Sequence, residues 1–215
     1  MRDLEMAFVG KIAASMTHEI KNTFAIILES AGLLSDIITL SQEGSFPHKE
    51  KFQRVLGNIN DQVKRGVDIT TRLNQFAHSM DEPLVSIQVS ALLDQIVMLM
   101  RRLAKRRGIE LKIAAPDRDL SFMSDPFRLL LVIGSIIEQL VESLESGGQI
   151  ILQPQGDHEE VRVLLEMRGE KKPGWETYME PRFSSLQEVV AALKARLAIS
   201  SPPGGEGVIL TIPTT

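Results

Sequence analysis

Hydrophobic positions in the first eighty residues recur at steps of three and four, which is the period of an α-helix. Residues 3–39 contain no proline, and the same period returns at residues 48–80 after a turn rich in Ser, Gly and Pro at residues 41–47. The sequence therefore predicts two long helices that form an antiparallel hairpin. The first apolar stripe consists of Val9, Ile12, Met16, Ile20, Thr23, Ile27, Ala31, Leu34 and Ile38. The second consists of Phe52, Val55, Ile59, Val63, Gly66, Val67, Thr70, Leu73, Ala77 and Met80.

Each helix of this hairpin has a strong stripe but only one partner within the chain. Pairing two hairpins into a four-helix bundle would bury both stripes, so we expect a homodimer. Asp81-Glu82-Pro83 ends the helical pattern, because proline disfavours helix in the residue before it. The sequence thus predicts a helical hairpin at residues 1–81 and a second domain at residues 82–215.

Strand and helix periods alternate in the second domain. Strands are predicted at residues 84–89, 109–114, 149–154, 161–167 and 208–212. Helices are predicted at residues 90–107 with Ser90 as N-cap, from Asp125-Pro126 to about residue 144, and at residues 186–197. Four or five strands and three helices in this order favour a two-layer α/β sandwich, and the whole chain is expected to be α+β.

Composition excludes several classes of function. A net charge of −4 and a pI near 5.7 argue against nucleic-acid binding. The absence of cysteine excludes disulfides and thiolate metal sites, and the four histidines are too scattered for a metal cluster. No apolar run has the length of a membrane span, and the first six residues carry two acids where a signal peptide needs cations. We expect a cytoplasmic protein that binds neither metal nor membrane.

His18 lies opposite the apolar stripe of the first helix on a helical wheel. Its neighbours on that face are small or polar, so the imidazole should be accessible to a partner. Glu19 could accept a proton from one ring nitrogen and leave the other as a nucleophile. Asn22, four residues further on, can position a water or a phosphoryl oxygen. The other members of the face are Lys11, Ala14, Ser15, Lys21, Ala25 and Glu29.

Residues 16–22, Met-Thr-His-Glu-Ile-Lys-Asn, resemble the H box of bacterial sensor histidine kinases, whose phosphoacceptor motif runs His-Glu-[Ile/Leu]-x-Asn. The hairpin is similar to their dimerisation and phosphotransfer domain, and residues 82–215 are similar in layout to their ATP-binding domain. Residues 124–129 look like the entry to the N-box helix, and residues 180–183 look like a remnant of the F box. The resemblance covers nearly the whole chain.

The resemblance does not extend to the residues with which that family binds ATP. Gln139 stands where an asparagine should hold Mg²⁺, and Ser135 occupies the second carboxamide position. Met167 replaces the aspartate that reads the adenine amine, and Lys171 replaces the last loop glycine, with Gly169 retained. Because a pocket built for a buried hydrogen bond loses much affinity without it, we expect no ATP and no other cofactor, with Mg²⁺ supplied by the partner.

A helical hairpin with an acceptor histidine and a degenerate ATPase domain resembles the histidine phosphotransferases of sporulation and cell-cycle phosphorelays. The resemblance implies that His18 carries phosphoryl groups between the aspartates of response-regulator receiver domains. Glu19 would act as base or orienting group, Asn22 would position oxygen atoms, and Lys21 would neutralise phosphoryl charge. The predicted docking surface comprises Ala25, Ile26, Glu29, Phe52, Gln53 and Leu56.

Two alternatives remain within signalling, and an active kinase is the least favoured interpretation. A receiver phosphatase would use Asn22 to align water for hydrolysis of the aspartyl phosphate. A non-catalytic scaffold would instead bind a sensor histidine kinase through its helical bundle.

Overall fold

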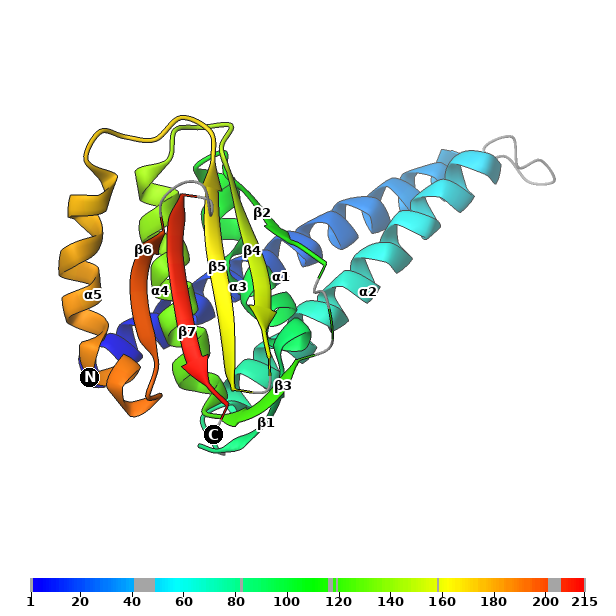
Figure 1. Cartoon of the computed structure of the whole chain (residues 1–215). Coiled ribbons are helices and arrows are strands. Elements are labelled where there is room, and N and C mark those ends of the chain that lie inside the picture. The colour runs from blue at the N-terminus through cyan, green and yellow to red at the C-terminus, as the bar shows by residue number, and fades with distance from the viewer. Residues whose placement is uncertain are drawn as a thin grey trace. The chain divides into compact units, whose positions relative to one another are not determined.

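The structure is a computed structural model that describes residues 2–40, 49–81, 83–115, 118, 120–157, 159–200 and 206–214. It confirms the α+β class, with helices first and a mixed region after them (Figure 1). The turn predicted at residues 41–47 and Glu82 of the predicted break lie outside the described residues.

The described residues contain five helices and seven strands. The helices are α1 (Arg2–Leu40), α2 (Lys49–His78), α3 (Val89–Arg106), α4 (Pro126–Ser143) and α5 (Trp175–Ala192). The strands are β1 (Val85–Gln88), β2 (Glu110–Ile113), β3 (Ser121–Ser124), β4 (Gln149–Gly156), β5 (Glu160–Arg168), β6 (Arg196–Ser200) and β7 (Gly207–Pro213).

The chain forms two compact units. The hairpin unit contains residues 13–76, and the mixed unit contains residues 77–215 together with residues 1–12. Helix α1 is therefore shared: its first turns pack within the mixed unit, and the remainder belongs to the hairpin.

In the hairpin unit, side chains at helical spacing on α1 and α2 form the seam between the two helices. The helices approach closely at Gly66, where an added Cβ would lie 3.4 Å from Thr23 Cγ2. A polar contact also crosses the seam, since Asn58 Nδ2 donates to Ser30 Oγ over 3.0 Å. The buried seam residues are Met16, Thr23, Ser30, Ile37, Val55, Ile69 and Phe76.

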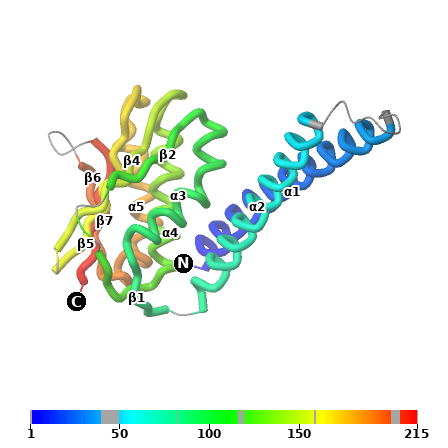
Figure 2. Tube along the Cα trace, turned by 90° about the vertical axis from the view of Figure 1, so that its right-hand side faces the viewer, coloured from blue at the N-terminus to red at the C-terminus, as the bar shows by residue number. Residues whose placement is uncertain are grey.

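The mixed unit has two layers, with a five-stranded sheet of order β2-β4-β5-β7-β6 and helices α3, α4 and α5 on one face of it (Figures 1 and 2). Strands β2 and β4 are parallel, and the other neighbouring pairs are antiparallel. A separate antiparallel pair, β1 and β3, lies outside this sheet. Asp125 caps α4 as predicted, because its side chain accepts from the Arg128 amide over 2.9 Å.

Helix α4 is buried around most of its circumference; residues 129–133 have no exposed surface. A helix that is apolar all round needs cover on more than one side. The start of α1 supplies part of that cover, since Phe8 packs edge-on against Phe127 with ring centroids 6.5 Å apart. Lys11 forms an ion pair with Glu138 on the next turns of α4.

Gly134 makes this contact between α1 and α4 fit. A Cβ added there would lie 2.7 Å from Phe8 Cε2 and 3.1 Å from Ile96 Cδ1. A side chain at this position would require the Phe8 ring to shift, so the glycine leaves the space that the ring fills.

Several expectations about the mixed unit are wrong. Helix α3 begins one residue earlier than predicted, and its N-cap is Gln88 without a side-chain cap bond, so Ser90 is not the N-cap. The helix predicted at residues 186–197 begins at Trp175 and ends at Ala192. Strands β3 and β6 were not predicted, which raises the strand number from the expected four or five to seven among the described residues.

Helix α1 alone among the described helices is long and apolar enough to cross a membrane, judged by length and composition only. The sequence had predicted no such segment. The apolar residues of α1 are accounted for by the hairpin seam and by an exposed face described below.

Replacing Gly134 with alanine should destabilise the mixed unit. Overpacking of a tight core costs about 1–3 kcal/mol, whereas the better helix propensity of alanine returns about 1 kcal/mol. We expect a net loss of up to roughly 2 kcal/mol in the free energy of unfolding, measured by urea denaturation.

Gly10→Ala is the matched control, because a Cβ at Gly10 meets no atom within 4 Å. This variant should gain stability through helix propensity alone. Equal stabilisation by both substitutions would contradict the packing of Phe8 against Gly134.

Candidate functional site

His18 lies on α1 with its side chain exposed to solvent, as the sequence predicted. Asn22 is exposed one turn further on, and residues four apart in a helix are neighbours on its surface. Lys21 and Ala25 are also exposed next to this face. The structure therefore brings together the imidazole, the carboxamide and the ammonium group that the sequence singled out.

Glu19, the predicted base or orienting group, contacts an arginine of the second helix. Its Oε1 lies 3.7 Å from Arg65 Nη2, and the side chains are 19% and 58% exposed respectively. The arginine holds this carboxylate at the edge of the seam, next in sequence to His18, and keeps most of its own surface open to solvent. A guanidinium at this position can form bidentate hydrogen bonds to phosphoryl oxygens.

Arg65 is a functional candidate that the sequence analysis missed. Its place beside Glu19 depends on how α1 and α2 align, and periodicity within one helix gives no information on that alignment. Residue pairs across the seam contain the missing information about this alignment. The close approach of Thr23 to Gly66, for example, places Arg65 beside Glu19.

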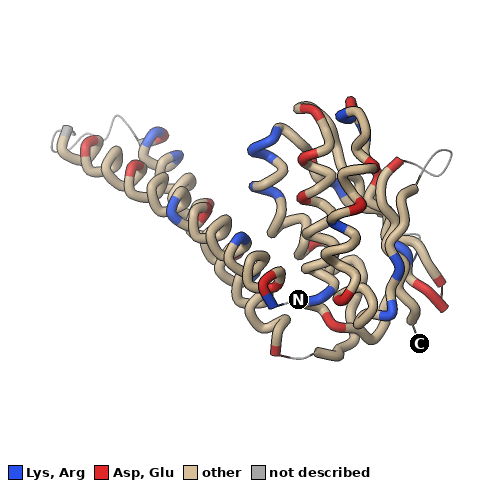
Figure 3. The backbone as a smooth tube through the Cα atoms, turned by 90° about the vertical axis from the view of Figure 1, so that its left-hand side faces the viewer, with Lys and Arg blue, Asp and Glu red and all other residues tan. Residues whose placement is uncertain are grey.

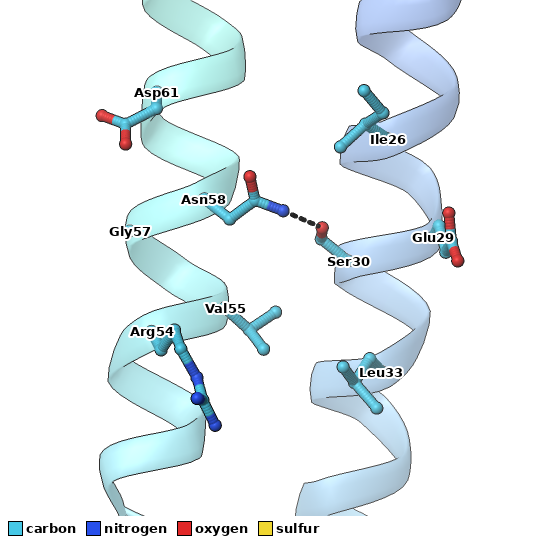
Figure 4. Close-up of a pocket in the computed structure, with 9 residues that line it drawn as sticks. All are labelled: Ile26, Glu29, Ser30, Leu33, Arg54, Val55, Gly57, Asn58 and Asp61. Carbon is cyan, nitrogen blue, oxygen red and sulfur yellow. Dashed lines mark hydrogen bonds between the residues drawn. The ribbon is translucent and has the colours of Figure 1, made fainter.

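A groove of about 670 Å³ runs between α1 and α2 on the same side as His18 (Figure 4). On α1 the spacing from His18 through Asn22 to Ile26, Glu29 and Leu33 is four, four, three and four residues, which keeps them near one face. The lining residues are Ile26, Glu29, Ser30, Leu33, Arg54, Val55, Gly57, Asn58 and Asp61.

The predicted docking residues divide between this groove and other surfaces. Ile26 and Glu29 line the groove, and Ala25 is exposed beside them. Phe52 is half-buried, whereas Gln53 and Leu56 are exposed, and none of these three is among the groove-lining residues. On α2 the groove is instead lined by Arg54, Val55, Gly57, Asn58 and Asp61.

The opposite face of the hairpin is apolar and exposed. Phe24, Leu28 and Ile38 lie on the same side of α1, and Leu28 is 76% exposed. Leu56, Val63 and Val67 do the same on α2. The groove, in contrast, has Glu29, Arg54 and Asp61 in its lining. Basic and acidic residues are both found along the hairpin (Figure 3).

No protein-family model matches the sequence, and no curated protein matches it either. Solved structures of histidine kinases do match. The catalytic domain of histidine kinase ThkA gives a TM-score of 0.52 at 18% identity, over 62% of this chain and 97% of that chain. A complex of histidine kinase ThkA with the response regulator TrrA gives a TM-score of 0.52 at 17% identity, over 100% of this chain and 64% of that chain. This chain has a histidine-kinase fold.

Met167, Ser135 and Gln139, the residues that depart from the ATP-binding groups of the kinase resemblance, lie in the core of the mixed unit or at its edge. Met167 lies in β5, is 3% exposed and pairs in register with Ile150 of β4, so it belongs to the core. Ser135 is buried in α4, and Gln139 is half-buried. None of these three side chains is a carboxylate or an asparagine, the groups that the kinase resemblance assigned to adenine and Mg²⁺.

A polar cluster ties together the segments that follow β5 and precede β7. Lys171 Nζ lies 2.6 Å from Glu206 Oε2, and the indole N–H of Trp175 donates to Glu206 Oε1 over 3.0 Å. Trp175 is 3% exposed and is the first residue of α5. The hydrogen bond from Lys171 lowers the pKa of the Glu206 carboxyl, burial opposes this, and the indole N–H adds to the lowering.

The Glu206 cluster should make the mixed unit sensitive to acid. A carboxyl whose pKa is lower in the folded than in the unfolded state stabilises the fold above its ordinary pKa of 4.5, and this stabilisation is lost as the pH falls through the folded value. Glu206→Gln should therefore be less stable than wild type at pH 7, and the difference should shrink below about pH 4.5.

Urea midpoints at pH 7, 5, 4 and 3, followed by the fluorescence of Trp175, the single tryptophan, would measure this. Glu110→Gln is a suitable control, because the Glu110 side chain is 57% exposed in its pair with Lys112. A difference in urea midpoint between Glu206→Gln and wild type that stays constant with pH would contradict the lowered pKa of Glu206.

Proposed function

We propose that the protein is a dimeric phosphorelay intermediate in which His18 carries a phosphoryl group between receiver-domain aspartates. The observation that carries the proposal is the exposed His18, with Asn22 one turn away, the Glu19–Arg65 pair beside it and a docking groove on the same face. The known complex of histidine kinase ThkA with a response regulator supports a receiver as the partner of this fold.

The transfer needs a nucleophile and charge stabilisation from this chain. A ring nitrogen of His18 attacks phosphorus, an N–P bond forms, and the P–O bond to the aspartate breaks as the carboxylate leaves with its electron pair. Glu19 accepts the hydrogen bond of the other ring nitrogen. Arg65 and Lys21 stabilise the charge on the phosphoryl oxygens. The second transfer, to another receiver, reverses these bond changes.

Phosphohistidine and aspartyl phosphate are both high-energy species, so neither transfer needs ATP. The core position of Met167 and the Lys171–Glu206–Trp175 cluster support a chain that uses no nucleotide. In this proposal the receiver supplies the Mg²⁺, and the protein works in the cytoplasm with its partners.

A second copy of the chain is the proposed occupant of the apolar hairpin face. Exposed apolar patches of this kind mark interaction sites. Pairing of the two faces would complete a four-helix bundle and leave both grooves at its outside.

A phosphatase is the second candidate. Asn22 is exposed on the His18 face, where its carboxamide could align a water with an aspartyl phosphate. A scaffold for a sensor histidine kinase would use the hairpin for binding alone and would transfer no phosphoryl group.

Transfer assays with labelled receiver domains test the relay. Receivers phosphorylated with radiolabelled acetyl phosphate should label wild-type protein, and His18→Gln should remain unlabelled because the nucleophile is gone. Arg65→Ala should keep the acceptor and slow transfer by roughly a hundredfold, the usual effect of losing one charge-stabilising donor.

The same assay separates the alternatives. A phosphatase would keep much of its activity in His18→Gln and lose it in Asn22→Ala. Binding of a sensor kinase without transfer to any receiver would favour the scaffold. Labelling of His18 from ATP and Mg²⁺ would contradict the nucleotide-free proposal.

The dimer has its own test. Leu28→Glu combined with Val67→Glu should convert the protein to monomers in sedimentation velocity, because four buried charges would face each other across the pair of hairpins. Gln53→Glu, which changes an exposed residue outside the apolar face, should leave the dimer intact. A monomeric wild type would overturn this part of the proposal.

A further inference from the structure

The two edges of the five-stranded sheet, β2 and β6, differ in their side chains. Strand β2 exposes Glu110 and Lys112 at alternate positions, and charges of this kind keep an edge strand from pairing with other chains. Strand β6 has one charge, Arg196, and continues with the uncharged run Leu-Ala-Ile-Ser. Among the described residues, the backbone bonds of residues 196–199 go only to β7, so β6 is open to an added strand.

A cleft of about 470 Å³ lies between β6 and helix α5 (Figure 1). We call it the edge cleft. Phe183, Val190 and Leu197 are half-buried in its wall, which leaves apolar surface next to the open strand. The lining consists of Glu180, Phe183, Ser184, Gln187 and Val190 from one stripe of α5, together with Leu197 of β6.

The alternation of side chains along β6 links the open strand to the edge cleft. Leu197 pairs in register with Leu210, which is fully buried beneath the helices, so Leu197 and Ile199 face the helix layer. Arg196 and Ala198 face the other side of the sheet. A strand added beside β6 follows the same alternation, and every second side chain then enters the edge cleft.

The two ends of the edge cleft differ in charge. The Ala195 amide donates to the Val190 carbonyl over 2.9 Å, so Val190 lies where the chain turns from α5 into β6. Glu180 is exposed at the far end, about 15 Å before Val190 along the helix. Arg196 is 80% exposed at the near end, on the outer face of the sheet. An extended segment with a basic residue at the far end and an acidic residue at the near end is therefore complementary in charge.

The shape of this surface favours an extended segment over a helix. Only a strand can use both the open backbone of β6 and the edge cleft, the first for hydrogen bonds and the second for alternate side chains. A second copy of the chain is disfavoured by the proposed hairpin dimer, because chains that pair through two different surfaces assemble without limit.

We propose that β6 and the edge cleft bind an extended segment of a partner protein by strand addition. The segment runs antiparallel to β6, the orientation that is more stable per residue. Its alternate large apolar side chains contact Phe183, Val190 and Leu197. A basic residue at its N-terminal end reaches Glu180, and an acidic residue at its C-terminal end lies beside Arg196. The site uses no residue of the hairpin unit, so it does not depend on the proposed phosphorelay.

A synthetic peptide with this pattern tests the site on the full-length protein. Lys-Thr-Ile-Thr-Leu-Glu, labelled with fluorescein and amidated, should bind with a saturable rise in fluorescence polarisation below about 1 mM. Ile-Leu-Lys-Glu-Thr-Thr has the same composition without the alternation and should bind at least about tenfold more weakly. Failure of the first peptide to bind, or equal binding of both, would overturn the proposal.

Methylation of peptide nitrogens distinguishes strand addition from simple filling of the cleft. In a strand beside β6, the amides of alternate residues point toward β6, and the others point toward solvent. One peptide is methylated at both Thr amides, and a second at the Ile and Leu amides. One of the two should bind like the parent peptide, and the other should lose binding. Equal affinities of the two methylated peptides would overturn strand addition.

Charge reversal tests the orientation of the segment. Glu180→Lys should weaken binding of Lys-Thr-Ile-Thr-Leu-Glu about fivefold and strengthen binding of Glu-Thr-Ile-Thr-Leu-Glu to a similar extent, the scale of one exposed ion pair. A merely structural role of Glu180 would not move the two peptides in opposite directions. Glu110→Lys, on the other edge strand, should change neither affinity. A Glu180→Lys protein that shifts both peptides alike would overturn the assigned orientation.

Sedimentation velocity tests the second copy as a rival occupant. Wild-type protein should form no species larger than the dimer, and Ala198→Lys, which places a charge on the open edge, should leave this distribution unchanged while weakening the peptide. Larger wild-type species that Ala198→Lys abolishes would assign the edge to a second copy and overturn the partner segment.

Discussion

The unbroken helical repeat of α1 is the constraint on which the rest of the structure depends. Because the helix runs from Arg2 to Leu40 without proline, one set of spacings assigns every side chain to a face. One face forms the seam with α2, a second is apolar and exposed, and a third carries His18 and the groove. Any kink would rotate His18 away from the residues that follow it on its face.

The same helix explains the unusual core of the mixed unit. Residues of α4 that face away from the sheet would be exposed if the fold ended at three helices, yet they are buried. Phe8 and Ile12 of α1 close over them, and Lys11 pairs with Glu138, which Arg182 also approaches to 3.8 Å. Helix α4 thus packs against the start of the helix that carries His18.

The sequence predicted those elements that are defined by local signals. Both hairpin helices follow from periodicity, and α4 follows from Asp125 as N-cap and Pro126 as first residue. The start of α5 was missed because Pro181 inside the helix removes a backbone donor, and buried Met179, Leu186 and Val189 compensate only in the folded chain. Strands β3 and β6 are short, and each is completed by pairing: β3 with β1, which is distant in sequence, and β6 with the following strand β7.

The candidate site shows the same division between local and tertiary information. His18 and Asn22 were placed on an exposed face by counting along one helix, whereas Arg65, Asn58 and Gly57 required the alignment of two. That alignment is set where side chains fit closely, at Thr23 against Gly66 and at Ser30 against Asn58. A shift of α2 by one turn would separate Arg65 from Glu19. The contacts that stabilise the hairpin are therefore also the contacts that position its chemistry, and in the proposed dimer they leave each groove free to receive a partner without competing with the second copy.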